Sequence, residues 1–206
     1  MIASGSSTLP SARGVDVDRQ RLMKRLDTAW CTFKESYAGL SEAQLMEPGV
    51  SGMWSVRDII AHVTTWEEEA LKHLPSILEG RRPPRYSVAY GGIDAFNAQM
   101  TTLKEGLPLS EVFRQLDDVH QRVIDVIERV PESHLTSESR FRRRLRLDTY
   151  AHYPKHAQAI RLWRERQAGR ASSGFVVFRF TPPRVSGKLS GHVRHRTYLH
   201  GPPRRN

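Results

Sequence analysis

Apolar residues recur at intervals of three and four along four stretches of the chain, which is the spacing of one face of an α-helix. The third stretch is interrupted by the segment EGLPLSE, and alternation typical of strands is nearly absent before residue 168. The pattern therefore predicts helices and no sheet. The predicted helices cover residues 17–37, 55–80, 94–103 continued by 110–130, and 148–167.

Capping signals fix several of these boundaries. Ser55 is followed three residues later by Asp58, a variant of the capping box that begins a helix. We expect Asp94 and Ser110 to cap the two halves of the third helix in the same way, and Pro131 to mark its end.

Four amphipathic helices, each with one apolar stripe, close most simply as a four-helix bundle. We therefore predict an all-α fold with a flexible N-terminus at residues 1–15, a bundle at 16–167 and a basic tail of low order at 168–206. The connection from 80 to 93 is long, so a simple up-down-up-down order does not follow from the pattern.

The charge of the chain is unevenly distributed. Its formal net charge is +10, yet the stretch from Ala168 onward carries eight Lys and Arg and no acidic residue. The remaining 24 basic residues face all 22 acidic ones, which leaves only +2 for the body. We therefore expect no nucleic-acid partner, except through non-specific phosphate contacts of the tail.

The remaining bulk features point to the cytoplasm. Cys31 is the single cysteine, so no internal disulfide is expected. No apolar run approaches the roughly 20 residues that span a membrane. The N-terminal segment MIASGSSTLPSARG lacks the apolar core of a secretory signal. The expected localisation is cytoplasmic, without a membrane partner.

Three histidines are candidate metal ligands. His152 and His156 are four residues apart on the fourth helix, which brings their Cβ atoms to about 5–6 Å. His62 lies on the flank of the apolar stripe of the second helix, so all three side chains can face the interior. The same pattern also fits core histidines bonded to their neighbours, and spacing alone leaves both interpretations open. His120, in the stripe of the third helix, fits a satisfied core histidine best, with a fourth ligand or a proton shuttle as the alternatives.

Pro154 lies between the two histidines of the fourth helix. Inside a helix it would remove an amide donor and clash with the carbonyl of Tyr150, which would bend the helix and re-aim His152. Alternatively, it marks a helix that starts late, with His152 in the approach to it. The sequence leaves both alternatives open.

Several segments resemble a known family. GMWSVRDIIAHVTTWEEEAL and DTYAHYPKHAQAIRLWRER resemble the second and fourth helices of the DinB/YfiT-like four-helix bundle superfamily. LDTAWCTFKESYAGLSEAQL and GIDAFNAQM are similar to its ClbS/DfsB branch. The resemblance covers about residues 17–167.

The resemblance implies a function as well as a fold. Metal-bearing members hold a divalent ion with one histidine of the second helix and two of the fourth, which here are His62, His152 and His156. It implies a cytoplasmic, metal-dependent thiol transferase or hydrolase that detoxifies small electrophiles, with Zn, Ni or Fe and a low-molecular-weight thiol as cofactors. The alternative is a metal-free ClbS/DfsB-like resistance protein that binds or hydrolyses a reactive natural product. A homodimer is left open.

A mechanism follows from these expectations. A cation held by three histidines favours the anion of a water or external thiol, which then attacks an electrophilic carbon. We expect Cys31, which lies off the apolar stripe, not to be the nucleophile. Asp58 and Glu69 flank His62 on its helix and are the nearest candidates to orient it.

Overall fold

A computed structural model describes residues 12–173, with side chains for residues 17–170. Within that range the chain is helical and has no strand. The N-terminal residues 1–11 and most of the expected tail, 174–206, lie outside the described residues. The elements are α1 (Ala12–Tyr37), α2 (Glu42–Met46), α3 (Val56–Leu78), α4 (Tyr86–Ala89), α5 (Ile93–Lys104), α6 (Leu109–Arg129), a 3-10 turn (Glu132–His134), α7 (Arg140–Asp148) and α8 (Tyr153–Ser173).

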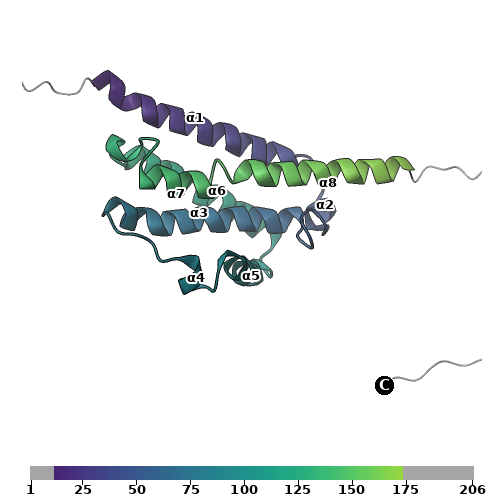
Figure 1. Cartoon of the computed structure of the whole chain (residues 1–206). Helices are drawn as coiled ribbons and strands as arrows, with labels where there is room; N and C mark the ends of the chain where they lie inside the picture. The colour runs from purple at the N-terminus through teal and green to yellow at the C-terminus, as the bar shows by residue number, and fades with distance from the viewer. Residues whose placement is uncertain (1–11, 174–206) are drawn as a thin grey trace, which may run out of the picture.

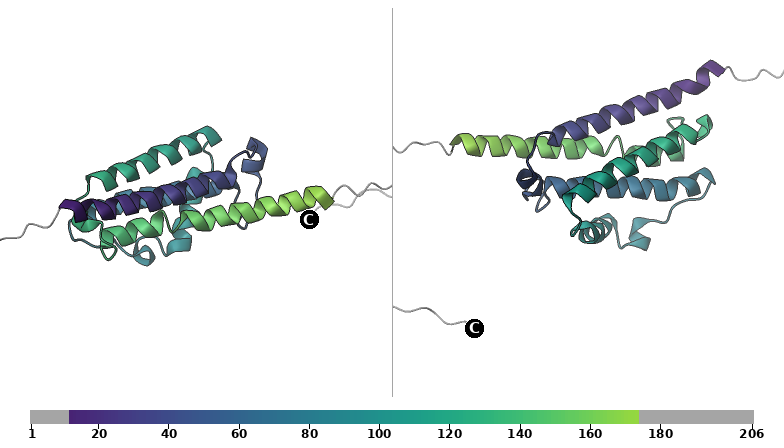
Figure 2. Two further views of the ribbon diagram at one scale, coloured as in Figure 1. Left: turned by 90° about the horizontal axis from the view of Figure 1, so that it is seen from above. Right: turned by 180° about the vertical axis from the view of Figure 1, so that it is seen from behind.

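The helices form the predicted four-helix bundle. Figure 1 shows α7 and α8 following one another in line, so that together they make the fourth rod beside α1, α3 and α6. The main packing pairs are α1 with α8, α3 with α6 and α3 with α7. The views from above and from behind in Figure 2 place α6 on the far side of the bundle. α5, the predicted first half of the third helix, is a separate helix that packs on α3, so α6 alone forms the third rod.

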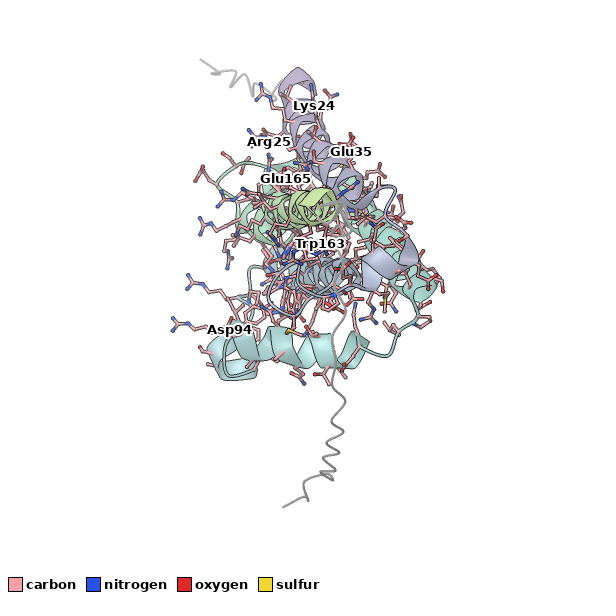
Figure 3. The ribbon with its side chains drawn as sticks, turned by 90° about the vertical axis from the view of Figure 1, so that its right-hand side faces the viewer. Lys24, Arg25, Glu35, Asp94, Trp163 and Glu165 are labelled. Atoms are coloured by element: carbon pink, nitrogen blue, oxygen red, sulfur yellow. The ribbon has the colours of Figure 1, made fainter. Side chains whose placement is uncertain are left out.

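The core consists of the apolar stripes that the sequence pattern predicts. Figure 3 looks along the bundle and shows Trp163 between α8 and α3. Burial of each such side chain stabilises the fold by roughly 1.5–3 kcal/mol. The buried stripe of α1 is Leu22, Leu26, Trp30, Phe33 and Tyr37.

The start of α3 is as predicted. The Ser55 side chain accepts a hydrogen bond from the amide of Asp58, and the Asp58 carboxylate accepts one from the amide of Ser55 at 3.0 Å. Two other predicted caps are wrong. α5 is capped by Gly92 and α6 by Pro108, so Asp94 and Ser110 are each the second residue of their helix. Gly92 has φ 128°, a conformation that favours glycine over Asp.

The fourth helix differs most from the prediction. The expected single helix from 148 to 167 is wrong, because α7 ends at Asp148, a turn follows, and α8 runs from Tyr153 to Ser173. Pro154 is the second residue of α8, where its missing amide would have had no acceptor in the helix. The late start is therefore the correct alternative. None of the helices in residues 12–173 combines the length and apolarity that a membrane span requires.

Candidate metal centre

The bundle brings His62, His152 and His156 together. The Nε2 atom of His62 on α3 lies 3.3 Å from Nε2 of His152, and the latter lies 2.8 Å from Nε2 of His156 on α8. One ring nitrogen from each of the three histidines lies within 4.8 Å of the corresponding ring nitrogens of the other two. Because α8 starts late, His152 lies in the turn before the helix, and only His156 is on the helix itself.

The spacing fits a small cation. Nitrogen ligands about 2.0–2.1 Å from a tetrahedral ion are about 3.3 Å apart. The His62–His152 separation already has this value, and the His152–His156 pair would have to open by about half an ångström. Among the residues that the structure describes, no other group of three His, Cys, Asp or Glu side chains lies close enough together to hold a metal ion.

Burial keeps the three imidazoles in the form that binds metals. It lowers the pKa of His62 to about 3, that of His152 to about 2 and that of His156 to about 4. Neighbouring charges, His156 for the first two and Lys155 for the third, lower each pKa further. A metal ligand must be a neutral imidazole, so the site is ready for a cation at neutral pH.

The surroundings of the triad are aromatic. The rings of Trp54 and His62 are 4.8 Å apart, and Trp66 meets His62 and His152 edge to face. Of the other two aromatic residues with helical spacing near the site, Trp163 belongs to the core and Tyr150 lines a separate hollow beside α1. Trp54 and Trp66 therefore form part of the wall around the triad.

Neither acid that we expected to orient His62 contacts the triad. The Asp58 carboxylate bonds to Ser55 and Arg57 at the start of α3. Glu69 accepts hydrogen bonds from Lys72 and Tyr86 and pairs with His73. Both acids share the face of α3 that His62 occupies, four residues before it and seven after it, but their carboxylates are bonded to other partners. The Nδ1 atom of His152 is buried without a well-aligned hydrogen bond, although the backbone of Asp148 acts to raise the pKa of His152.

A pocket of about 350 Å³ opens beside the triad. Its wall joins apolar and polar side chains from α3, α4, α5, α7 and the start of α8, a mixture typical of small-molecule sites. The residues that line it are His62, Trp66, Tyr86, Ile93, Asn97, Arg144, Leu147, Asp148, His152 and Lys155.

The polar group at one side of this pocket does not follow from the sequence pattern. The Arg144 guanidinium pairs with the Asp148 carboxylate and donates a hydrogen bond to the Tyr86 hydroxyl at 2.9 Å. Burial raises the pKa of Asp148 to about 7, against the opposing effect of Arg144. A signal existed in the i, i+4 spacing of Arg144 and Asp148, but α7 was not predicted as a helix.

The comparison with protein families decides the classification. Residues 25–159 match the model of the DinB superfamily. The chain belongs to the DinB superfamily. The match includes all three histidines of the triad and ends within α8.

Two solved structures share the fold. ClbS, a colibactin self-resistance protein crystallised in complex with double-stranded DNA, superposes with a TM-score of 0.58 at 14% identity, covering 69% of this chain and 92% of ClbS. An uncharacterised protein from Escherichia coli UTI89 superposes with a TM-score of 0.60 at 12% identity, covering 73% of this chain and 94% of the other. No curated protein matches this chain significantly in sequence. The expected resemblance to the DinB superfamily and to ClbS in fold is confirmed.

Proposed function

We propose that the chain is a metal-dependent enzyme that adds water or a small thiol to an electrophilic compound. The observation that carries this proposal is the convergence of three neutral imidazoles beside a pocket of small-molecule size. His62, His152 and His156 would hold a divalent cation such as Zn, Ni or Fe. That ion would supply Lewis acidity, which favours the deprotonated form of a nucleophile.

The side chains of the pocket suit a partly apolar electrophile with an electronegative leaving group. Trp66, Ile93 and Leu147 offer apolar surface for the body of such a compound. Arg144, fixed by Asp148 and Tyr86, places a cation at one wall, where it would stabilise negative charge as the leaving group departs. Trp66 Nε1 donates a hydrogen bond to the side-chain oxygen Oδ1 of Asn97 at 3.2 Å. This bond uses the oxygen of the Asn97 side chain and not its NH₂ group, which would donate to a substrate oxygen.

The experiment uses full-length protein purified without a histidine tag. We expect about one equivalent of bound metal after dialysis against zinc, nickel or ferrous salts, and turnover of 1-chloro-2,4-dinitrobenzene or an epoxide that depends on the metal. Product analysis with and without added thiol separates a transferase from a hydrolase. If the protein binds no metal after this dialysis, the proposal is wrong, and a metal-free resistance protein similar to ClbS is favoured instead.

We propose contact with double-stranded DNA as a second candidate function, because the body of the chain carries a basic surface that its small net charge conceals. Arg25 and Tyr150 are shared by two adjoining hollows beside α1, whose lining includes Glu138 as its one acidic residue. Figure 3 shows Lys24 and Arg25 on α1. Within residues 17–170 no ion pair or side-chain hydrogen bond engages the exposed cations of these hollows, which are Arg21, Lys24, Arg25, Arg143 and Arg146.

Free cations along one surface suit the phosphate backbone of a duplex, and such binding weakens steeply with salt. We expect a plot of log affinity against log salt to be shallower, by about 0.9 per lost phosphate contact, in the variant Lys24→Glu/Arg25→Glu/Arg143→Glu. A chain ending at Ser173 separates this surface from the expected contribution of the tail. DNA binding that the truncation abolishes and the triple variant leaves unchanged would assign the contact to the tail alone.

A further inference from the structure

A second histidine site lies on the opposite side of α3 from the helix α5. It begins with Glu67, whose side chain is fully buried in the bundle. Its Oε1 atom accepts hydrogen bonds from the Tyr153 hydroxyl and from Nδ1 of His120, the latter at 2.8 Å. Its Oε2 atom is buried without a partner in the described part of the chain. Two donors on one oxygen fit a carboxylate, and such a charge is costly to bury.

The bond to Glu67 fixes the tautomer of His120. With the proton on Nδ1, Nε2 keeps its lone pair and acts as an acceptor or a nucleophile. The imidazole lies flat against Trp30, with ring centroids 3.6 Å apart and planes 1° apart, so the ring cannot rotate freely. His120 is only 6% exposed, and its Nε2 atom neither forms a hydrogen bond nor is fully buried within residues 17–170.

The exposed edge of His120 lines a groove of about 710 Å³ between α1 and α6. Met23, Leu26 and Ile124 give this groove an apolar wall, while the charges at its rim, Lys24 and Lys34 against Asp27 and Asp117, are balanced. A groove of this size accepts a small molecule, and its balanced rim favours an uncharged one. The triad of His62, His152 and His156 lines no part of it.

We propose that this groove is a second reactive site, in which His120, supported by Glu67, is a nucleophile toward small uncharged acyl compounds. Nε2 forms a bond to the carbonyl carbon, and the bond from that carbon to the leaving group breaks, with its electron pair departing on the leaving group. The Nδ1 proton passes to Glu67, which leaves a neutral acyl-imidazole. The hydroxyl of a water then bonds to the carbonyl carbon, and the bond from that carbon to Nε2 breaks with its electron pair staying on Nε2. Glu67 returns its proton to Nδ1, and the remaining proton of the water leaves with the expelled leaving group as the acid is released.

A structural role alone accounts poorly for this arrangement. Buried charged pairs are often replaced by apolar side chains without loss of stability. Here the carboxylate instead orients one nitrogen of a nearly buried imidazole toward the single groove that reaches it among the hollows found in the described residues. A carboxylate that orients an imidazole in this way is the arrangement that activates a histidine in many hydrolytic sites.

Diethyl pyrocarbonate, a small activated acyl compound, tests the proposal on the full-length protein in the presence of a metal chelator. Peptide mass spectrometry measures the rate of modification at each histidine, with the half-buried His134 as an internal reference. We expect His120 to react at least as fast as His134 despite its burial. In Glu67→Gln, which keeps the size of the side chain and removes its charge, the rate at His120 should fall about tenfold while the rate at His134 stays unchanged.

A second pair of variants tests the groove without touching Glu67 or His120. Gln121→Trp narrows the groove and should slow modification of His120, whereas Arg122→Trp, on the next residue of α6 and outside the groove, should not. This pair of tryptophan variants also tests the proposal if Glu67→Gln does not unfold cooperatively on heating. The proposal is overturned if His120 stays unmodified while His134 reacts, or if both tryptophan variants behave alike. Because no metal is present, these outcomes are independent of those at the triad.

Discussion

Nε2 of His62 lies 3.3 Å from Nε2 of His152, although 90 residues separate them in the chain. The contact exists because α3 packs against the fourth rod at the point where that rod is broken between α7 and α8. In a continuous helix His152 would lie one turn before His156 on the same helical face. The turn at 149–152 instead presents it to α3 and to His156.

Metal binding should fail when any histidine of the triad is lost. Each of His62→Ala, His152→Ala and His156→Ala leaves two nitrogen ligands, which form a weak and exchangeable site. We expect bound metal, measured by mass spectrometry after dialysis, to fall from about one equivalent to near zero. His134→Ala is the matched control and should keep the full amount. Retention of metal in all three variants would mean that the ion lies elsewhere.

The stability of the metal-free protein should depend on pH in a defined window. The triad imidazoles have pKa values of about 3, 2 and 4 in the folded state against 6.5 in a free imidazole. Below pH 6.5 these three imidazoles bind more protons in the unfolded chain than in the folded one, so their contribution to stability is complete above 6.5 and falls as the pH drops to 4 and below. Asp148 and Glu67, whose pKa values burial raises, act in the opposite direction, but they are two groups against three. We expect the melting temperature to fall over this window, and less so in His62→Gln. A melting temperature that is flat from pH 7 to pH 4.5 would contradict the burial of the triad.

Arg144 and Asp148 should be strongly coupled. Their side chains are 14% and 4% exposed, so removing one leaves a buried charge without its partner. We expect Arg144→Met or Asp148→Leu alone to lower the free energy of unfolding by about 3–5 kcal/mol, and the double variant to lose much less than the sum. Denaturant melts of the four proteins complete the cycle. Additive losses would show that solvent already compensates the two charges.

The two capping boxes should differ in their effect on stability. Ser55→Ala removes the cap of the long buried helix α3 and should cost about 1 kcal/mol. Ser41→Ala removes the same arrangement from α2, which has five residues and is mostly exposed, and should cost about 0.5 kcal/mol or less. Denaturant melts of the two variants measure the difference. Equal losses would mean that the caps act through local hydrogen bonds alone, independent of what the helix packs against.

The fold class can be predicted from the amino-acid sequence alone, because helix formation and burial follow from local spacing. The spacing of Leu22, Leu26 and Phe33 predicts that they are buried, whichever helices pack against them. The same holds for the start of α3, since Ser55 and Asp58 are three residues apart and cap the helix within one turn. Spacing and resemblance also predict the three candidate ligands, but not the distances between them.

How these residues meet depends on the packing of helices that are distant in the chain. Whether Pro154 bends a helix or starts one depends on how the turn at 149–152 packs, and that packing carries His152 to His62. The partners of Glu67 come from helices 53 and 86 residues away, so no local pattern could connect them. Buried polar groups often find their partners through the packing of distant helices, and this placed Glu67 beside His120. Asp58 and Glu69 instead pair with nearby residues and not with the triad.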